Sequence, residues 1–164
     1  MSPAVLEIDV NVTPGASFSD GLVFSYSSTS PCLDDEKGNI TLPRNGRAVM
    51  IRFNLLTKTL SWKEGPYVGT FEVNLQAGKD ATAEDTLWIW PAGSAKGKAA
   101  PSTFSGYEFG DDTAARHRRV SVRTANGRAE THCYGLAVGI VVRRDKIEVV
   151  RDDPRIRNGG LSAE

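Results

Sequence analysis

The two histidines of the chain are the first residues to consider for metal chemistry, and their settings differ. His117 lies among three arginines, whose positive charge opposes a bound metal cation. His132 lies in the stretch THCYGLAV, where it shares a strand face with apolar residues and is expected in the core or at its edge. A zinc or cupin-type site needs several His or carboxylate ligands that converge on one point. The sequence therefore predicts no histidine-rich metal site, and we expect no cofactor.

Acidic clusters offer a second kind of chemistry, because loop carboxylates bind calcium. The clusters are Asp34-Asp35-Glu36, Asp111-Asp112 and Asp152-Asp153. None of them has the ligand spacing of an EF-hand. Adjacent acids in loops are also common as solvated turn formers. Calcium binding at these loops is therefore an alternative that the sequence leaves open.

Nucleophilic catalysis has no local signature in this chain. The Gly-x-Ser-x-Gly segment of a nucleophile elbow does not occur. Cys133 directly follows His132, so that their side chains project from opposite faces of a strand. We expect a protein that is not an enzyme. A jelly-roll enzyme with an acidic site on the loops at 28–38 and 111–112 is the alternative.

Aromatic residues form the best candidate for a binding site. Within the segment TLWIWP, Leu87 and Ile89 share one strand face. If that face belongs to the core, Trp88 and Trp90 stand on the outer face as a platform for a sugar ring, a peptide or a partner protein. The alternative is that both faces are buried, the outer one by the loop at 91–103. The candidate ligand-binding residues are Trp88, Trp90, Trp62 and Tyr67.

Composition restricts the partners and the compartment. The 20 Lys and Arg residues balance the 20 Asp and Glu residues, so the formal net charge is zero. A general nucleic-acid role usually comes with an excess of basic charge, and we expect no nucleic-acid partner. No apolar run approaches the ~18 residues of a membrane helix, and the N-terminus lacks the basic region of a signal peptide. The expectation is a cytoplasmic protein without a membrane partner, with signal-independent secretion left open.

Cys32 and Cys133 lie far apart in the chain. In a cytoplasmic protein two free thiols are the favoured interpretation, and a disulfide that closes a long loop is the alternative. Cys133 falls within an expected strand, where a buried small side chain is its usual role.

The elements that must position these residues are expected to be short strands. Residues 4–13 alternate between apolar and polar side chains, and similar segments follow along the chain with Gly, Pro, Asn and Asp between them. Asn126-Gly127 predicts a two-residue hairpin turn between the strands on either side of it. A second hairpin is expected at Arg144-Asp145. The tail at 152–164 has Pro and Gly where a strand would fail.

These patterns predict the fold class. Eight to ten short strands in 164 residues, without a long window of helical periodicity, indicate an all-β protein. We expect a single two-layer β-sandwich domain over 1–164, Ig-like or jelly-roll, with long loops near 28–38 and 91–103.

Arginines alternate along the expected strand at 116–123. Arg119 and Arg123 share one face of it, which can bind an anionic partner or form ion pairs across the sheet. Cross-strand pairing is the commoner outcome, and Glu130, Asp145 and Glu148 are the partners considered.

Two segments near the ends of the chain are LEIDVNV followed by LVFSYSS, and the closing DDPRIRNGG with Asp153-Pro154 and Ile156-x-Asn158. In these segments the chain resembles the DP-EP family of bacterial all-β proteins. The resemblance implies a β-sandwich of unknown function and transfers no catalytic or ligand residues. Asp-Pro is also a common strand-ending turn.

The function expected from these observations is that of a non-catalytic binding or interaction module with an aromatic outer-strand face. Its partner would be a protein, a peptide or a glycan. The alternatives are a structural protein that forms homo-oligomers through its sheet edges and the jelly-roll enzyme described above.

Overall fold

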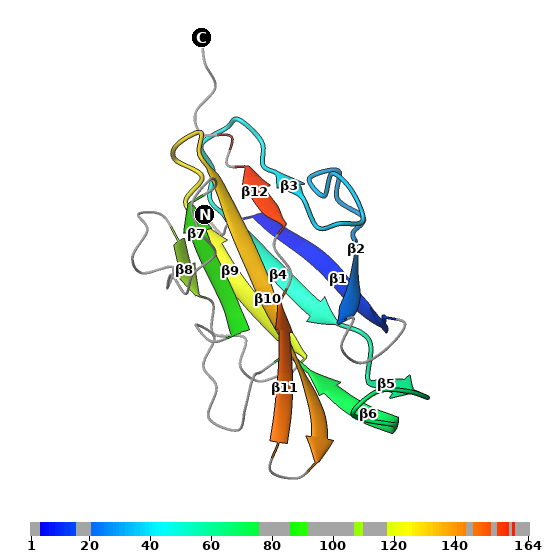
Figure 1. The fold of residues 1–164 in the computed structure, drawn as a ribbon. Helices are drawn as coiled ribbons and strands as arrows, with labels where there is room; N and C mark the ends of the chain where they lie inside the picture. The colour runs from blue at the N-terminus through cyan, green and yellow to red at the C-terminus, as the bar shows by residue number, and fades with distance from the viewer. Residues whose placement is uncertain are drawn as a thin grey trace.

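The computed structural model describes twelve strands in two sheets that lie face to face (Figure 1). The described residues are 4–15, 21–75, 86–91, 107–109, 118–143, 146–151, 154–157 and 159. The all-β sandwich predicted from the sequence is therefore confirmed. No helix in these ranges is long and apolar enough to cross a membrane. The expected loop at 91–103 lies almost entirely outside the described residues.

The first sheet has the strand order β2-β1-β4-β9-β8. Its strands are β1 (Ala4–Pro14), β2 (Leu22–Ser27), β4 (Val49–Leu55), β8 (Tyr107–Phe109) and β9 (Arg119–Thr124). The pairing of β1 with β4 is parallel, and the other pairings in this sheet are antiparallel.

The second sheet is built around the long strand β10 (Thr131–Arg143). The other strands are β3 (Ile40–Thr41), β5 (Thr59–Trp62), β6 (Gly69–Asn74), β7 (Leu87–Pro91), β11 (Lys146–Arg151) and β12 (Arg155–Arg157). Strands β7 and β12 pair with the first half of β10, and β6 and β11 pair with its second half (Figure 1). The antiparallel pairing of β10 with β11 confirms the hairpin expected at 144–145, whose turn residues lie outside the described part.

Aromatic side chains from both sheets meet in the core. Tyr134 of β10 lies against Phe53 of β4 at a ring-centroid distance of 5.2 Å and meets Tyr26 of β2 edge-on at 6.4 Å. All three side chains are buried. The alternation expected over 4–13 is confirmed, because every second residue of β1 from Leu6 to Val12 is buried.

The prediction of a hairpin at Asn126-Gly127 is wrong. Strand β9 belongs to the first sheet and β10 to the second, so the connection between them crosses from one layer to the other. Asn126 has a positive φ of 52°, but its side chain is buried and holds other loops. Its amide group donates to the Pro43 carbonyl oxygen at 2.9 Å and accepts from the Gly159 N–H at 2.8 Å. The Asn-Gly pair thus forms a corner between the layers.

The expectation for the tail is also wrong in part. Residues 155–157 form β12, which lies between β3 and β10 in the second sheet (Figure 1). Ile156 faces the core and is fully buried, while the residues on either side of it are exposed. Pro154 does not interrupt the strand because it stands just before it, where its carbonyl oxygen accepts from Tyr134 N–H at 2.9 Å.

Candidate functional site

The tryptophans on β7 do not form the open platform that the sequence suggested. Trp88 and Trp90 do face away from the core, since Leu87 and Ile89, which alternate with them along β7, are fully buried. Trp90 is nevertheless only 4% exposed, and Trp88 is partly buried. The residues of β10 directly beside them are small: Cys133 is paired with Trp90, and a glycine with Trp88. Small neighbouring side chains leave space for the indole rings to pack flat against the sheet.

Trp62 is the last residue of β5, and Tyr67 lies in the connection between β5 and β6. Both rings contact Phe71 of β6, at centroid distances of 6.1 Å and 6.4 Å. Trp62 is 5% exposed and Tyr67 is partly buried. Because β6 and β7 pair with different halves of β10, the structure brings Trp62 and Tyr67 together but does not join them to Trp88 and Trp90 in one site. A ligand-binding role of the four residues stays a prediction.

The acidic loop at 34–36 is organised by its own hydrogen bonds. One Asp35 carboxylate oxygen accepts the main-chain N–H groups of Lys37 and Asn39, and the other accepts from the Asn39 side chain at 2.9 Å. The Asn39 side chain is the main cause of the lowered pKa of Asp35, slight burial opposes it, and the two N–H groups lower it further. Among the described residues no three His, Cys, Asp or Glu side chains are grouped to hold a metal ion. Asp35 is therefore a turn-forming residue, and Asp111 and Asp112 lie outside the described part.

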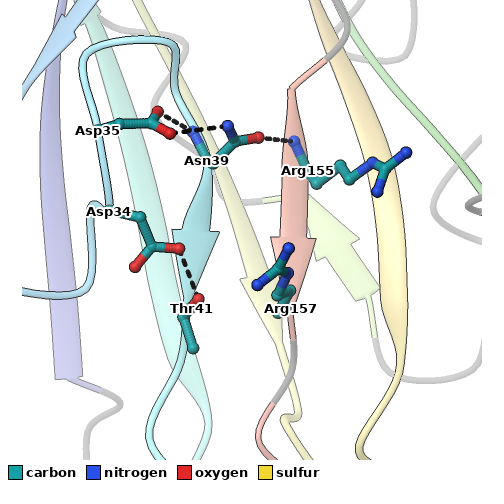
Figure 2. A pocket seen from close by; sticks show the side chains of 6 residues that line it. All are labelled: Asp34, Asp35, Asn39, Thr41, Arg155 and Arg157. Atoms are coloured by element: carbon teal, nitrogen blue, oxygen red, sulfur yellow. Dashed lines mark hydrogen bonds between the residues drawn. The ribbon is translucent and has the colours of Figure 1, made fainter.

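A polar pocket of about 460 Å³ opens beside this loop (Figure 2). It is lined by Asp34, Asp35, Asn39, Thr41, Arg155 and Arg157. Thr41 of β3 donates its hydroxyl hydrogen to Asp34 at 2.6 Å, and the Asn39 side chain accepts the Arg155 main-chain N–H at 3.1 Å. These bonds join the 34–41 segment to β12, so the pocket spans the seam between two segments that are far apart in the sequence.

The two arginines of the pocket are placed by the alternation of β12. Arg155 and Arg157 point outward because Ile156 between them points into the core. Both side chains are exposed, and no ion pair or hydrogen bond joins either guanidinium group to another described residue. In Figure 2, Arg157 stands in front of β12, and the Arg155 side chain extends away from the two carboxylates. The two cations are therefore open to a ligand.

Sequence reasoning missed these arginines because the tail was expected not to form a strand. The signal was present in the segment Arg-Ile-Arg, which has one apolar residue between two polar ones. That pattern is typical of a half-buried strand, but three residues are too few to weigh against the neighbouring Pro and Gly.

The outer face of the first sheet uses its arginines differently. Arg52 contacts Glu7 at 2.6 Å, and Asn54 donates to the same carboxylate at 2.8 Å. Burial raises the pKa of Glu7, but the hydrogen bonds from Asn54 and Arg52 lower it, and the net pKa lies below the ordinary value. Arg119 donates to the Asn54 side chain, and Arg123 pairs with Glu108 at 3.5 Å. Cross-strand pairing is thus confirmed for Arg123, with a partner that the sequence did not suggest.

His132 lies on the core side of β10, as expected. It is buried, and its Nδ1 atom shares a hydrogen bond of 3.2 Å with the hydroxyl of Tyr107 from the opposite sheet. Desolvation lowers the pKa of His132, and the nearby Glu130 carboxylate partly opposes this. Because the pocket arginines are on the outer side of the same sheet, His132 cannot act on a ligand bound there.

Both cysteines are free: Cys133 is buried in β10 and Cys32 is partly exposed.

Comparison with models of protein families gives no match, and comparison with curated proteins gives none either. The resemblance of the chain ends to the DP-EP family therefore stays a prediction.

Proposed function

We propose that the protein is a non-catalytic binding module whose site is the pocket between the 34–41 segment and β12. One observation carries the proposal. Arg155 and Arg157 are exposed at alternate positions of β12 without a described acidic partner, although Asp34 and Asp35 line the same pocket. The two carboxylates are instead held by Thr41 and Asn39. The guanidinium groups are therefore available to bind an external anion, with which they can form charge-assisted hydrogen bonds.

The lining residues favour binding over catalysis. Among the described lining residues the only hydroxyl group, on Thr41, donates to Asp34. Acyl transfer would need a base such as histidine to activate that hydroxyl and donors for an oxyanion. His132 faces the opposite side of the sheet, toward Tyr107. The jelly-roll enzyme therefore has less support than a binding module.

The proposal is tested by NMR titration of the isotope-labelled chain with a panel of amino acids, monosaccharides, uronic acids and nucleotides. We expect the amide signals of Asn39, Thr41, Arg155 and Arg157 to move with at least one compound. The double substitution Arg155→Gln and Arg157→Gln should abolish these shifts. Arg123→Gln is the matched control, because it removes an exposed arginine of the first sheet and leaves the pocket unchanged. A panel that moves only signals outside the pocket, or none at all, would contradict the proposal.

A structural role through self-association is the second candidate. Strand β2 is an edge strand of the first sheet, and its Val23 is 59% exposed. Exposed edges with apolar residues favour pairing between copies of a chain. The mass from light scattering tests this: a dimer that Val23→Lys converts to a monomer would support it, and a monomeric wild-type protein would exclude it.

A further inference from the structure

We propose that the ligand of the β12 pocket is an acidic saccharide, which binds through a uronic carboxylate and the hydroxyl groups beside it. The inference rests on the proposed function and names the ligand class for the same site. It follows from the hydrogen-bonding capacity that each lining residue has left.

Most of the polar side-chain atoms that the 34–41 segment contributes to the pocket already form hydrogen bonds. Both carboxylate oxygens of Asp35 accept hydrogen bonds from the loop, and the Asn39 side chain both donates to Asp35 and accepts from Arg155 N–H. The Thr41 hydroxyl hydrogen is given to one oxygen of Asp34. The second oxygen of Asp34 and the guanidinium groups of Arg155 and Arg157 therefore remain for a ligand, and the exposed Arg155 side chain, which extends away from the two carboxylates in Figure 2, has to turn toward it.

The remaining Asp34 oxygen and the two guanidinium groups require two kinds of group in one ligand. The guanidinium groups only donate, so they need acceptors, and a planar carboxylate matches their fork geometry. The free Asp34 oxygen only accepts, so it needs a donor. A hydroxyl group both donates and accepts, and it can bridge Asp34 and a neighbouring arginine. A uronic acid carries the carboxylate and the hydroxyl groups on one ring.

The charge of the pocket favours a single negative charge. The described lining residues contribute two carboxylates and two guanidinium groups, so their formal charges sum to zero. A dianionic phosphate would be attracted by Arg155 and Arg157 but repelled by Asp34 and Asp35 at the same time. A monoanion with several hydroxyl groups gains the arginine contacts with less of this repulsion.

The polarity of the pocket favours a saccharide over an acidic peptide. All six described lining residues are polar or charged, whereas peptide and protein interfaces gain most of their affinity from aromatic or aliphatic anchors in apolar pockets. An oligosaccharide also suits the pocket because five of its six described lining residues are exposed. The partly exposed Trp88 lies on the same outer face, two strand spacings or about 10 Å from β12.

The experiment uses the full chain and isothermal titration calorimetry with three probes of similar length. The probes are a hexameric oligogalacturonate, its fully methyl-esterified form and a hexaglutamate peptide. We expect the oligogalacturonate to bind, the ester to bind at least tenfold more weakly, and hexaglutamate to bind more weakly than the sugar acid. Arg157→Gln and Arg155→Gln should each weaken oligogalacturonate binding about tenfold or more, as expected for loss of a charge-assisted hydrogen bond. Arg123→Gln should bind like the wild type.

The outcomes separate this inference from the proposed function. Equal binding of the ester would show that the carboxylate is not recognised, and tighter binding of hexaglutamate would identify an acidic peptide as the ligand. Either result overturns the saccharide assignment. The pocket remains a binding site in both cases if the two arginine substitutions still weaken the interaction. No binding of any probe overturns the assignment as well, and the NMR panel then decides the proposed function. Asp34→Asn adds a second check, because it keeps an acceptor for Thr41 but removes the charge. It should weaken oligogalacturonate binding if a sugar hydroxyl donates to Asp34, and strengthen it if only the negative charge of the ligand matters.

Discussion

The hydroxyl group of Tyr134, on the central strand of the second sheet, donates a hydrogen bond to the main-chain carbonyl oxygen of Gly38 in the pocket loop. The two residues are 96 positions apart in the sequence. Gly38 is buried and has a φ of +93°, and a Cβ atom there would lie 2.8 Å from the Tyr134 hydroxyl and from two ring atoms of Tyr26. The loop that carries Asp34 and Asp35 is thus fastened to the core at a point where only glycine fits.

Gly38→Ala should destabilise the protein by about 3 kcal/mol or more, because the strained backbone and the close contacts add to each other. Urea unfolding followed by circular dichroism measures this loss. Gly21→Ala is the matched control, since Gly21 has a φ of +77° but a Cβ atom added there would have no neighbouring atom within 4 Å. It should cost only about 1 kcal/mol. Equal losses in the two variants would show that the contacts with Tyr134 and Tyr26 contribute nothing.

Asn126 holds the other end of the pocket region in place. Its side chain connects the Pro43 carbonyl oxygen, just after β3, with the N–H of Gly159, just after β12. Asn126→Ala should cost about 3 kcal/mol, because it removes these hydrogen bonds and places alanine at a positive φ. Asn126→Gly avoids the backbone strain of the positive φ, and the glycine variant should therefore be about 1 kcal/mol more stable than the alanine variant. Thermal unfolding of the two variants checks the order; an alanine variant as stable as the glycine variant would contradict the role of the backbone conformation.

Much of the fold could be predicted because the alternation of single strands is a local signal. Residues 4–13 alternate as β1 does, and β1 buries the apolar side chains of that pattern from Leu6 to Val12. The pairing of strands was harder to predict. Asn126-Gly127 has the composition of a hairpin turn, but the burial of Asn126 between two loops depends on residues about 80 and 30 positions away.

The candidate site was predicted less well than the fold, for the same reason. Trp88 and Trp90 were assigned correctly to the outer strand face, but strand alternation does not tell whether that face is open. Trp90 is buried beside Cys133, which is distant in sequence. Arg155 and Arg157 become a pair only when β12 inserts between β3 and β10, and three residues carry too weak a local signal to predict that pairing.

Protonation of His132 should destabilise the fold as the pH falls. Burial lowers the pKa of His132 in the folded protein, so below the ordinary value of 6.5 the unfolded chain binds a proton that the folded chain does not. This contribution to stability is complete above about pH 7 and is lost progressively as the pH falls through about 6.5 toward the lower folded-state pKa. Among the described residues, the titratable groups next to the ring include Tyr107 of β8 and Glu130.

The measurement is the free energy of unfolding in urea at pH 7.5 and pH 5.5. We expect the wild type to lose stability between these values and His132→Gln to lose clearly less. Tyr107→Phe is the control, because it removes the hydrogen bond to Nδ1 but keeps the imidazole buried, and it should retain the pH dependence. If the histidine variant shows the same pH dependence as the wild type, other groups cause it.

The burial of the tryptophans predicts the fluorescence of the protein. Trp62 and Trp90 are 5% and 4% exposed, whereas Trp88 is partly exposed on the outer face of β7. The emission of the wild type should therefore be blue-shifted, and iodide should quench only a minor part of it. Trp88→Phe should remove most of the quenchable part, while Trp90→Phe and Trp62→Phe should leave it nearly unchanged. Strong quenching that disappears in Trp90→Phe would mean that this face opens in solution, and it would restore Trp90 as a residue that can stack on a ligand.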